Sequence, residues 1–147
     1  MYVYQKRIKG ITRGYRTYAY GKEDSRAAII IPNDTLDAIM FTQCSDIDMV
    51  LSEIKTGQEA FYAASAYMDY NYTIGKSITN IEKTMELTKG VKIIMAIDSN
   101  SRSIIWHYVT TNVRGRLLEE FIASNQIQII NEESGSTIFH SSRGQTT

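Results

Sequence analysis

The 147-residue chain has one cysteine, Cys44, and only two histidines, His107 and His140. A single cysteine excludes an intrachain disulfide and a cysteine-cluster zinc site, and it is typical of a reducing compartment. So few histidines disfavour a multi-histidine metal site. Sixteen basic and sixteen acidic residues cancel, so the net charge gives no support for nucleic-acid binding. A balanced net charge is nevertheless compatible with a local basic face on the surface.

Long apolar runs are absent too. No run approaches the roughly 20 residues that a membrane helix requires, so we expect no membrane partner. Residues 1–16 are tyrosine-rich and basic without an apolar core; they are not a signal peptide, and we expect an intracellular protein. Pro32, the only proline, leaves no obvious linker. The length fits one domain over residues 1–147.

Short apolar and β-branched segments dominate the first half of the chain. They predict five strands: residues 15–20, 26–31, 36–43, 46–54 and 58–67. The short turns between the last three predict an antiparallel meander. In residues 46–54, Asp46 and Asp48 alternate with apolar residues, so we expect this strand to have one face in water.

Helical periodicity follows. Apolar residues spaced four, three and four apart predict one stripe of an amphipathic helix between Thr73 as N-cap and Gly90: Ile74, Ile78, Ile81 and Met85. A second helix is expected over residues 115–125, with four residues buried: Leu117, Leu118, Phe121 and Ile122. Two strands, 127–131 and 137–140, should follow around a turn at 132–136. The order predicts an α/β sandwich.

The most informative stretch is residues 91–100. Its first seven residues are apolar without alternation, which predicts a strand buried on both faces. Asp98 and Asn100 follow at once, where layered α/β proteins gather their chemistry. Asp98 could take a hard cation or a proton, and Asn100 could orient a phosphate or a water. The alternative is simple turn chemistry, which both residue types favour.

A family resemblance is carried by motifs in a fixed order. They are Ser65-Ala-Tyr67, Asp98-Ser-Asn100, Trp106, Arg114-Gly115 leading into Leu117-Leu118-Glu119-Glu120, and Ser136-Thr-Ile-Phe139. Together they resemble the endonuclease domain of non-LTR retrotransposons, the apurinic-endonuclease-like branch of the endonuclease/exonuclease/phosphatase superfamily. The resemblance covers nearly the whole chain.

The resemblance implies a four-layered α/β sandwich of the DNase-I-like type that nicks DNA in the nucleus with Mg²⁺, beside a reverse transcriptase domain. Asp98 matches the aspartate that activates or positions water, Asn100 the asparagine that stabilises the phosphate, and Tyr67 the tyrosine that hydrogen-bonds it. DNA contacts are expected from three arginines: Arg102, Arg114 and Arg116.

The chain also departs from the family pattern. The metal-binding glutamate and the terminal Ser-Asp-His motif are missing, Arg102 stands where histidine is frequent, and Met68-Asp69 replaces a proline-containing turn. We therefore expect an incomplete, central part of the fold, truncated at both ends, with no metal ligand of its own and no nuclease activity by itself. One alternative is a non-catalytic remnant that binds nothing, or that binds nucleic acid weakly through a set of basic residues: Arg7, Lys9, Arg13, Arg16, Arg102, Arg114 and Arg116. Another is a phosphatase or phosphodiesterase of the same superfamily.

Overall fold

The computed structural model describes residues 14–21, 24–32, 36–131, 139–141 and 144–146, the last two stretches by their backbone. These residues belong to two compact units, Met1–Asn100 and Ser101–Thr147. The arrangement of one domain over residues 1–147 stays a prediction. In the described part of the chain, neither helix is long and apolar enough to cross a membrane.

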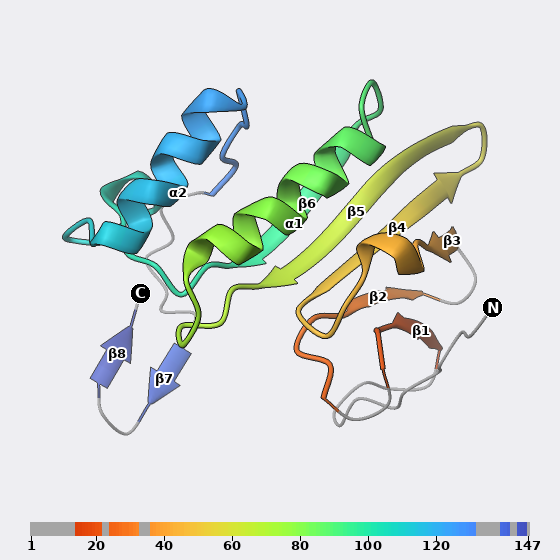
Figure 1. The fold of residues 1–147 in the computed structure, drawn as a ribbon. Coiled ribbons are helices and arrows are strands. Elements are labelled where there is room, and N and C mark those ends of the chain that lie inside the picture. Colours follow the sequence, from red (N-terminus) through yellow and green to blue (C-terminus); the bar gives the residue numbers. More distant parts are fainter. Residues whose placement is uncertain (1–13, 22–23, 33–35, 132–138, 142–143, 147) are drawn as a thin grey trace. The chain divides into compact units, whose positions relative to one another are not determined.

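A four-stranded sheet forms the centre of the first unit, in the order β3 (Asp37–Met40), β4 (Met49–Thr56), β5 (Glu59–Tyr67) and β6 (Ile93–Asp98). The first three strands run antiparallel, as the predicted meander requires. β5 and β6 run parallel, and the helix α1 (Ile74–Leu87) connects them (Figure 1). The carboxyl ends of β5 and β6 therefore lie at the same end of the sheet.

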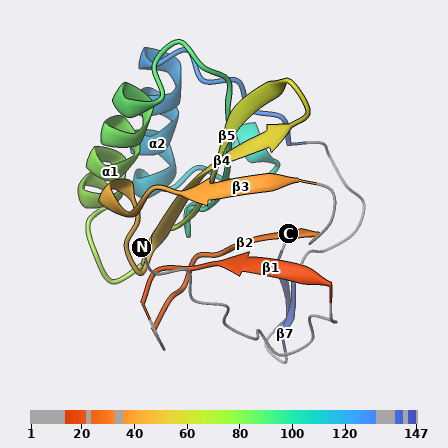
Figure 2. The ribbon, with the colours of Figure 1, turned by 90° about the vertical axis from the view of Figure 1, so that its right-hand side faces the viewer.

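The two faces of this sheet are covered differently. On one face lies α1, whose Thr84 hydroxyl is 3.9 Å from the Met49 sulfur. On the other face lies an antiparallel pair, β1 (Tyr15–Tyr18) and β2 (Ile29–Pro32) (Figure 2). Tyr18 and Ile31 of this pair pack in one buried cluster with residues of β4. The first unit is thus a layered α/β structure, and the predicted α/β fold class is confirmed.

Two predictions about strand burial are wrong. β4 begins at Met49, and its first four residues are buried, because the strand lies between α1 and the β1–β2 pair. Asp46 and Asp48 precede it and form no wet face of a strand. β6 was expected to be buried on both faces, but Ile94 is 56% exposed. The buried cluster under the β1–β2 pair includes residues of β4, partly buried residues of β5 pack against it, and no residue of β6 belongs to it.

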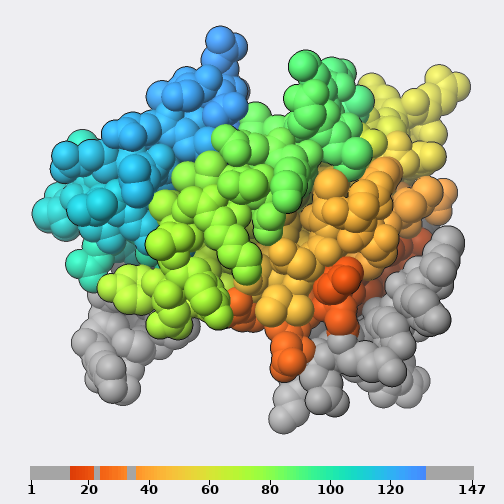
Figure 3. Space-filling view, viewed as in Figure 1, coloured from red at the N-terminus to blue at the C-terminus, as the bar shows by residue number. Residues whose placement is uncertain are grey.

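The helix α1 follows its predicted stripe. Ile74 and Ile81 are buried, and Ile78 and Met85 are half-buried. Thr73 occupies the N-cap position, although its side chain makes no capping hydrogen bond. Gly90 has a φ of 81°, a conformation that glycine adopts at little cost, and it turns the chain into β6 after the helix ends. The outer face of α1, in green, forms part of the surface in Figure 3.

The second unit contains the 3-10 turn η2 (Ile104–Trp106), the helix α2 (Val113–Ser124) and a hairpin of β7 (Phe139–Ser141) and β8 (Gly144–Thr146). α2 buries Leu118 and Phe121 as predicted, but Leu117 is 44% exposed. Residues 127–131 form no strand: their sequence favours extended backbone, but no strand pairs with them in the described part of the chain. The turn predicted at 132–136 lies outside the described residues.

Candidate active site at the carboxyl ends of β5 and β6

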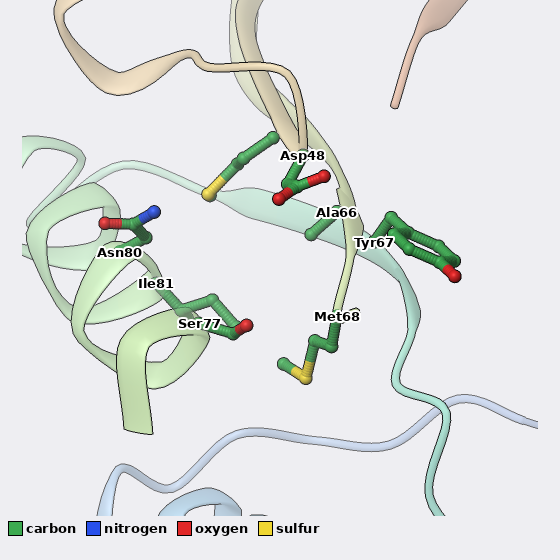
Figure 4. A pocket seen from close by; sticks show the side chains of 8 residues that line it. Asp48, Ala66, Tyr67, Met68, Ser77, Asn80 and Ile81 are labelled. Carbon is green, nitrogen blue, oxygen red and sulfur yellow. The ribbon is translucent and has the colours of Figure 1, made fainter. Parts of the chain in front are cut away.

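Tyr67 and Asp98 are the last register pair between β5 and β6. Side chains of paired residues on neighbouring strands project from the same face of a sheet. In Figure 4 the ring of Tyr67 points away from α1, so the phenol and the carboxylate share the face opposite this helix. Asp98 is exposed and Tyr67 half-buried. The structure thus brings these two predicted site residues together, while their catalytic roles stay a prediction.

Asn100 joins them through the loop that leaves β6. Its backbone has a φ of 46°, and its N–H donates to Asp98 Oδ1 at 3.3 Å. Its side-chain Nδ2 donates to the carbonyl of Met68 at 3.1 Å, and the N–H of Met68 donates to the carbonyl of Asp98 at 2.8 Å. The Asp98-Ser-Asn100 turn therefore forms as turn chemistry predicts. The same bonds hold the amide beside the end of β5.

An ion-pair cluster that the sequence did not reveal lies next to Tyr67. Arg26 donates to both carboxylate oxygens of Asp48, from Nε at 2.5 Å and Nη2 at 2.7 Å, and to Asp69 through Nη1. Its guanidinium carbon lies 5.0 Å from the centroid of the Tyr67 ring. Residues 26–31 were expected to form one strand, but β2 begins at Ile29, which leaves Arg26 outside the ladder. In the sequence, the one feature that could have pointed to this cluster was the position of Arg26 directly before an apolar run.

The cluster shifts the pKa values of its members in the directions that ion pairing requires. Hydrogen bonds from the backbone N–H of Asn71 and from Arg26 lower the pKa of Asp69 below its usual value. The two carboxylates Asp48 and Asp69 raise the pKa of Arg26. Arg26 is therefore held as a cation over the Tyr67 ring, and its N–H groups point at protein carboxylates.

The small hollow drawn in Figure 4 lies on the α1 side of the sheet. It is lined by Met49, Met68, Asn80 and Ile81 among others, and its volume of about 20 Å³ has room for one water molecule. Tyr67 is among the residues that line this hollow, but its ring points away from it in Figure 4, and Asp98 does not line it. The hollow is therefore not the place where the phenol and the Asp98 carboxylate meet. The candidate site is instead the open surface on the opposite face.

The three arginines predicted to contact DNA belong to the second unit. The N–H of Arg102 donates to Asn112 Oδ1 at 3.2 Å, and its carbonyl accepts the N–H of Asn112 at 3.0 Å. A Cβ atom at residue 115 would lie 1.9 Å from the Arg102 carbonyl oxygen, which explains Gly115. Arg102 and the first turn of α2, with Arg114 and Arg116, are thus held together.

Arg16, another basic residue considered for nucleic-acid binding, donates to the carbonyl of Leu36 and is half-buried. Three further basic residues of that set, Arg7, Lys9 and Arg13, lie outside the described residues.

The described residues contain no group of three or more histidine, cysteine, aspartate or glutamate side chains that could hold a metal ion. At the site, Asp98 offers one exposed carboxylate, while Asp48 and Asp69 face Arg26. Magnesium is bound through one or two carboxylates, with water and substrate phosphate completing its shell. At the site the described residues thus supply one exposed carboxylate and do not form a complete metal centre.

Three comparisons with known proteins each find similarity to endonuclease-reverse transcriptase or retrotransposon proteins. A family model described as endonuclease-reverse transcriptase matches residues 61–147. The Retrovirus-related Pol polyprotein from type-1 retrotransposable element R1 of Bradysia coprophila is 27% identical over 128 residues, which is 82% of this chain and 13% of that protein. The solved endonuclease domain of TRAS1, a telomere-specific non-LTR retrotransposon, has the same fold: the TM-score is 0.83 at 22% identity, over 92% of this chain and 65% of that one.

Proposed function

The chain belongs to the endonuclease-reverse transcriptase family, and from this premise we propose that it hydrolyses phosphodiester bonds of DNA as the target-nicking endonuclease of a retrotransposon. One observation carries the proposal: the pairing of Tyr67 with Asp98 at adjoining strand ends, with Asn100 held beside them. The chain spans 13% of the related Pol polyprotein. A reverse transcriptase partner in the same polyprotein, and action in the nucleus, are part of this proposal.

Each of the three side chains has a distinct role. The Asp98 carboxylate orients the attacking water and accepts its proton. The Tyr67 hydroxyl donates to a phosphate oxygen, where negative charge grows in the transition state. An amide carries two N–H donors; one of Asn100 is bound to the Met68 carbonyl, and the other donates to the phosphate. The first bond fixes the direction of the second.

Magnesium is the proposed cofactor. The ion would supply positive charge for the phosphoryl oxygens, but the one carboxylate that the described residues offer at the site, Asp98, is already assigned to the attacking water. Because the described residues provide only this carboxylate at the site, we propose that residues 1–147 alone cleave DNA very slowly or not at all. We also propose that Arg102, Arg114 and Arg116 contact phosphates of the substrate, each adding to the salt dependence of binding.

A nicking assay on supercoiled plasmid with Mg²⁺ tests the proposal. Residues 1–147 are assayed beside the same residues within any longer reading frame that encodes them. Asp98→Asn should lower the nicking rate by about 100-fold or more, the range for loss of a general base. The matched control is Asp37→Asn, an exposed aspartate on β3 of the same sheet, which should nick at the wild-type rate.

Equal nicking by the Asp98→Asn and wild-type proteins would refute the assignment of the site. If every form binds DNA in a salt-dependent manner and none nicks it, the non-catalytic alternative is correct. Turnover of a small phosphate ester without nicking would instead identify a phosphatase of the same superfamily.

A further inference from the structure

The loop of residues 68–73, between β5 and α1, follows Tyr67 directly and carries two exposed aromatic side chains. Tyr70 is 73% exposed and Tyr72 58% exposed. In Figure 3 this yellow-green segment stands out from the surface near the start of α1. Two large rings in water, three and five residues from the site tyrosine, are not explained by packing of the core.

The loop is fixed rather than loosely attached. Asp69 Oδ1 accepts the N–H of Asn71 at 2.8 Å and its Nδ2 at 3.0 Å, and the N–H of Tyr72 donates to the Asp69 carbonyl at 3.3 Å. The other oxygen of Asp69, Oδ2, binds Arg26, which in turn holds Asp48. The tip that carries Tyr70 is therefore anchored at its base by an ion-pair cluster.

The same loop is tied to the candidate site. Met68, its first residue, exchanges hydrogen bonds with both ends of the Asp98-Ser-Asn100 turn, through the Asp98 carbonyl and the Asn100 amide. A ligand bound at Asp98 and Asn100 therefore sits next to a loop whose position depends on the same two residues. The backbone of Met68 is therefore the link between the loop and the candidate site.

A positive charge accompanies the rings. The ammonium of Lys76, in the first turn of α1, lies 5.4 Å from the centroid of the Tyr72 ring. An aromatic surface next to a cation matches a nucleotide, whose base presents a flat π-face and whose phosphate carries negative charge. A nucleotide is favoured over a peptide or a lipid because the adjoining Asp98 and Asn100 are proposed to bind a phosphodiester.

We infer that residues 68–73 form a stacking surface for DNA, on which Tyr70 receives an unstacked base next to the phosphate bound at Asp98 and Asn100. Lys76 lies where it neutralises a neighbouring phosphate. The inference rests on the proposed function, since it takes DNA to be the substrate. Stacking on tyrosine does not depend on which base is present, so this surface adds affinity without sequence preference.

The test measures binding of two labelled probes by fluorescence anisotropy at low salt: a short single-stranded DNA, and an abasic strand of equal length and charge. Tyr70→Ala should weaken binding of the normal strand by about tenfold, within the range for loss of one stacked base. It should leave binding of the abasic strand unchanged. Tyr70→Phe, which keeps the ring, should bind both strands as the wild type does.

Tyr15→Ala is the matched control, because Tyr15 is 48% exposed and lies on β1, away from this loop in the chain; it should bind both probes normally. Equal weakening on both strands, or no weakening on either, would overturn the inference, as would failure of the wild type to bind the normal strand more tightly than the abasic one. If Tyr70→Ala binds normally while Asp98→Asn abolishes nicking, the stacking surface is wrong and the proposed function survives.

Discussion

Asn100 allows the structural and chemical roles of one side chain to be separated. Its backbone lies in the left-handed region with a φ of 46°, and its amide bridges to the Met68 carbonyl at 3.1 Å. Asn100→Gly removes the amide and the Cβ and fits that backbone conformation, whereas Asn100→Ala removes the amide but keeps a Cβ where alanine is less well tolerated than asparagine. Both variants lack the second N–H that is proposed to contact the phosphate.

The expected free energies follow from these contacts. Loss of the half-buried hydrogen bond to Met68 destabilises the fold by about 1 kcal/mol in both variants. Alanine in the left-handed region adds about 1 kcal/mol more. In the glycine variant, relief at the backbone roughly offsets the greater freedom of the unfolded chain, each being below about 1 kcal/mol. Asn100→Gly should therefore unfold about 1 kcal/mol more easily than the wild type, and Asn100→Ala about 2 kcal/mol more easily.

For a chain of this size, 1 kcal/mol corresponds to about 2–4 °C in the unfolding midpoint. Circular dichroism during heating should place Asn100→Gly that far below the wild type, and Asn100→Ala lower by the same step again. Nicking should fall by the same large factor in both variants. If the alanine variant is as stable as the glycine variant, the left-handed backbone is wrong. If Asn100→Gly nicks normally, the amide has no chemical role.

Three further predictions concern the same unit. Leu51 is fully buried on β4, so Leu51→Ala should lower the free energy of unfolding, measured by urea titration, by about 3 kcal/mol. A decrease below about 1 kcal/mol would contradict the place of Leu51 in the core. Arg26→Lys cannot span Asp48 and Asp69 together, so amide exchange in residues 68–73 should quicken and nicking fall by about 10- to 100-fold; unchanged exchange would argue against the anchor. Asp69 has a lowered pKa, so its contribution to stability is present above the pKa of the unfolded chain and is lost as the pH falls through the lower folded value. Asp69→Asn should lose less stability than the wild type below about pH 4, and parallel urea midpoints across pH would contradict this.

Local periodicity carried most of the fold prediction. The stripe of Ile74 and Ile81 identified α1 because a helix repeats every 3.6 residues whatever it packs against. The short turn between the predicted strands 46–54 and 58–67 likewise marked the β4–β5 hairpin, and Gly57 in this turn has a φ of 59°. Burial was predicted less well. The apolar run before Asp98 indicates only that β6 is hydrophobic, and Ile94 is exposed because the β1–β2 pair does not extend over it.

The candidate site divides in the same way. Asp98 and Asn100 were singled out by their positions after an apolar strand, since a polar residue at such a point is a local signal. Tyr67 was identified only through the family resemblance. Arg26 and Asp69 could not be found, because they are 43 residues apart and each looks like an ordinary surface charge. The acids Asp46 and Asp48 were taken for the wet side of a strand.

The sequence alone therefore determined which segments are helical or extended, which residues end β5 and β6, and which family the motifs resemble. These properties depend on neighbours along the chain. Only the tertiary structure decided that Tyr67 pairs with Asp98 in register, that Arg26 joins Asp48 to Asp69, and that Tyr70 stands on an anchored loop. Such contacts depend on how separate strands and loops align in space, and that alignment leaves no periodic trace in the order of residues.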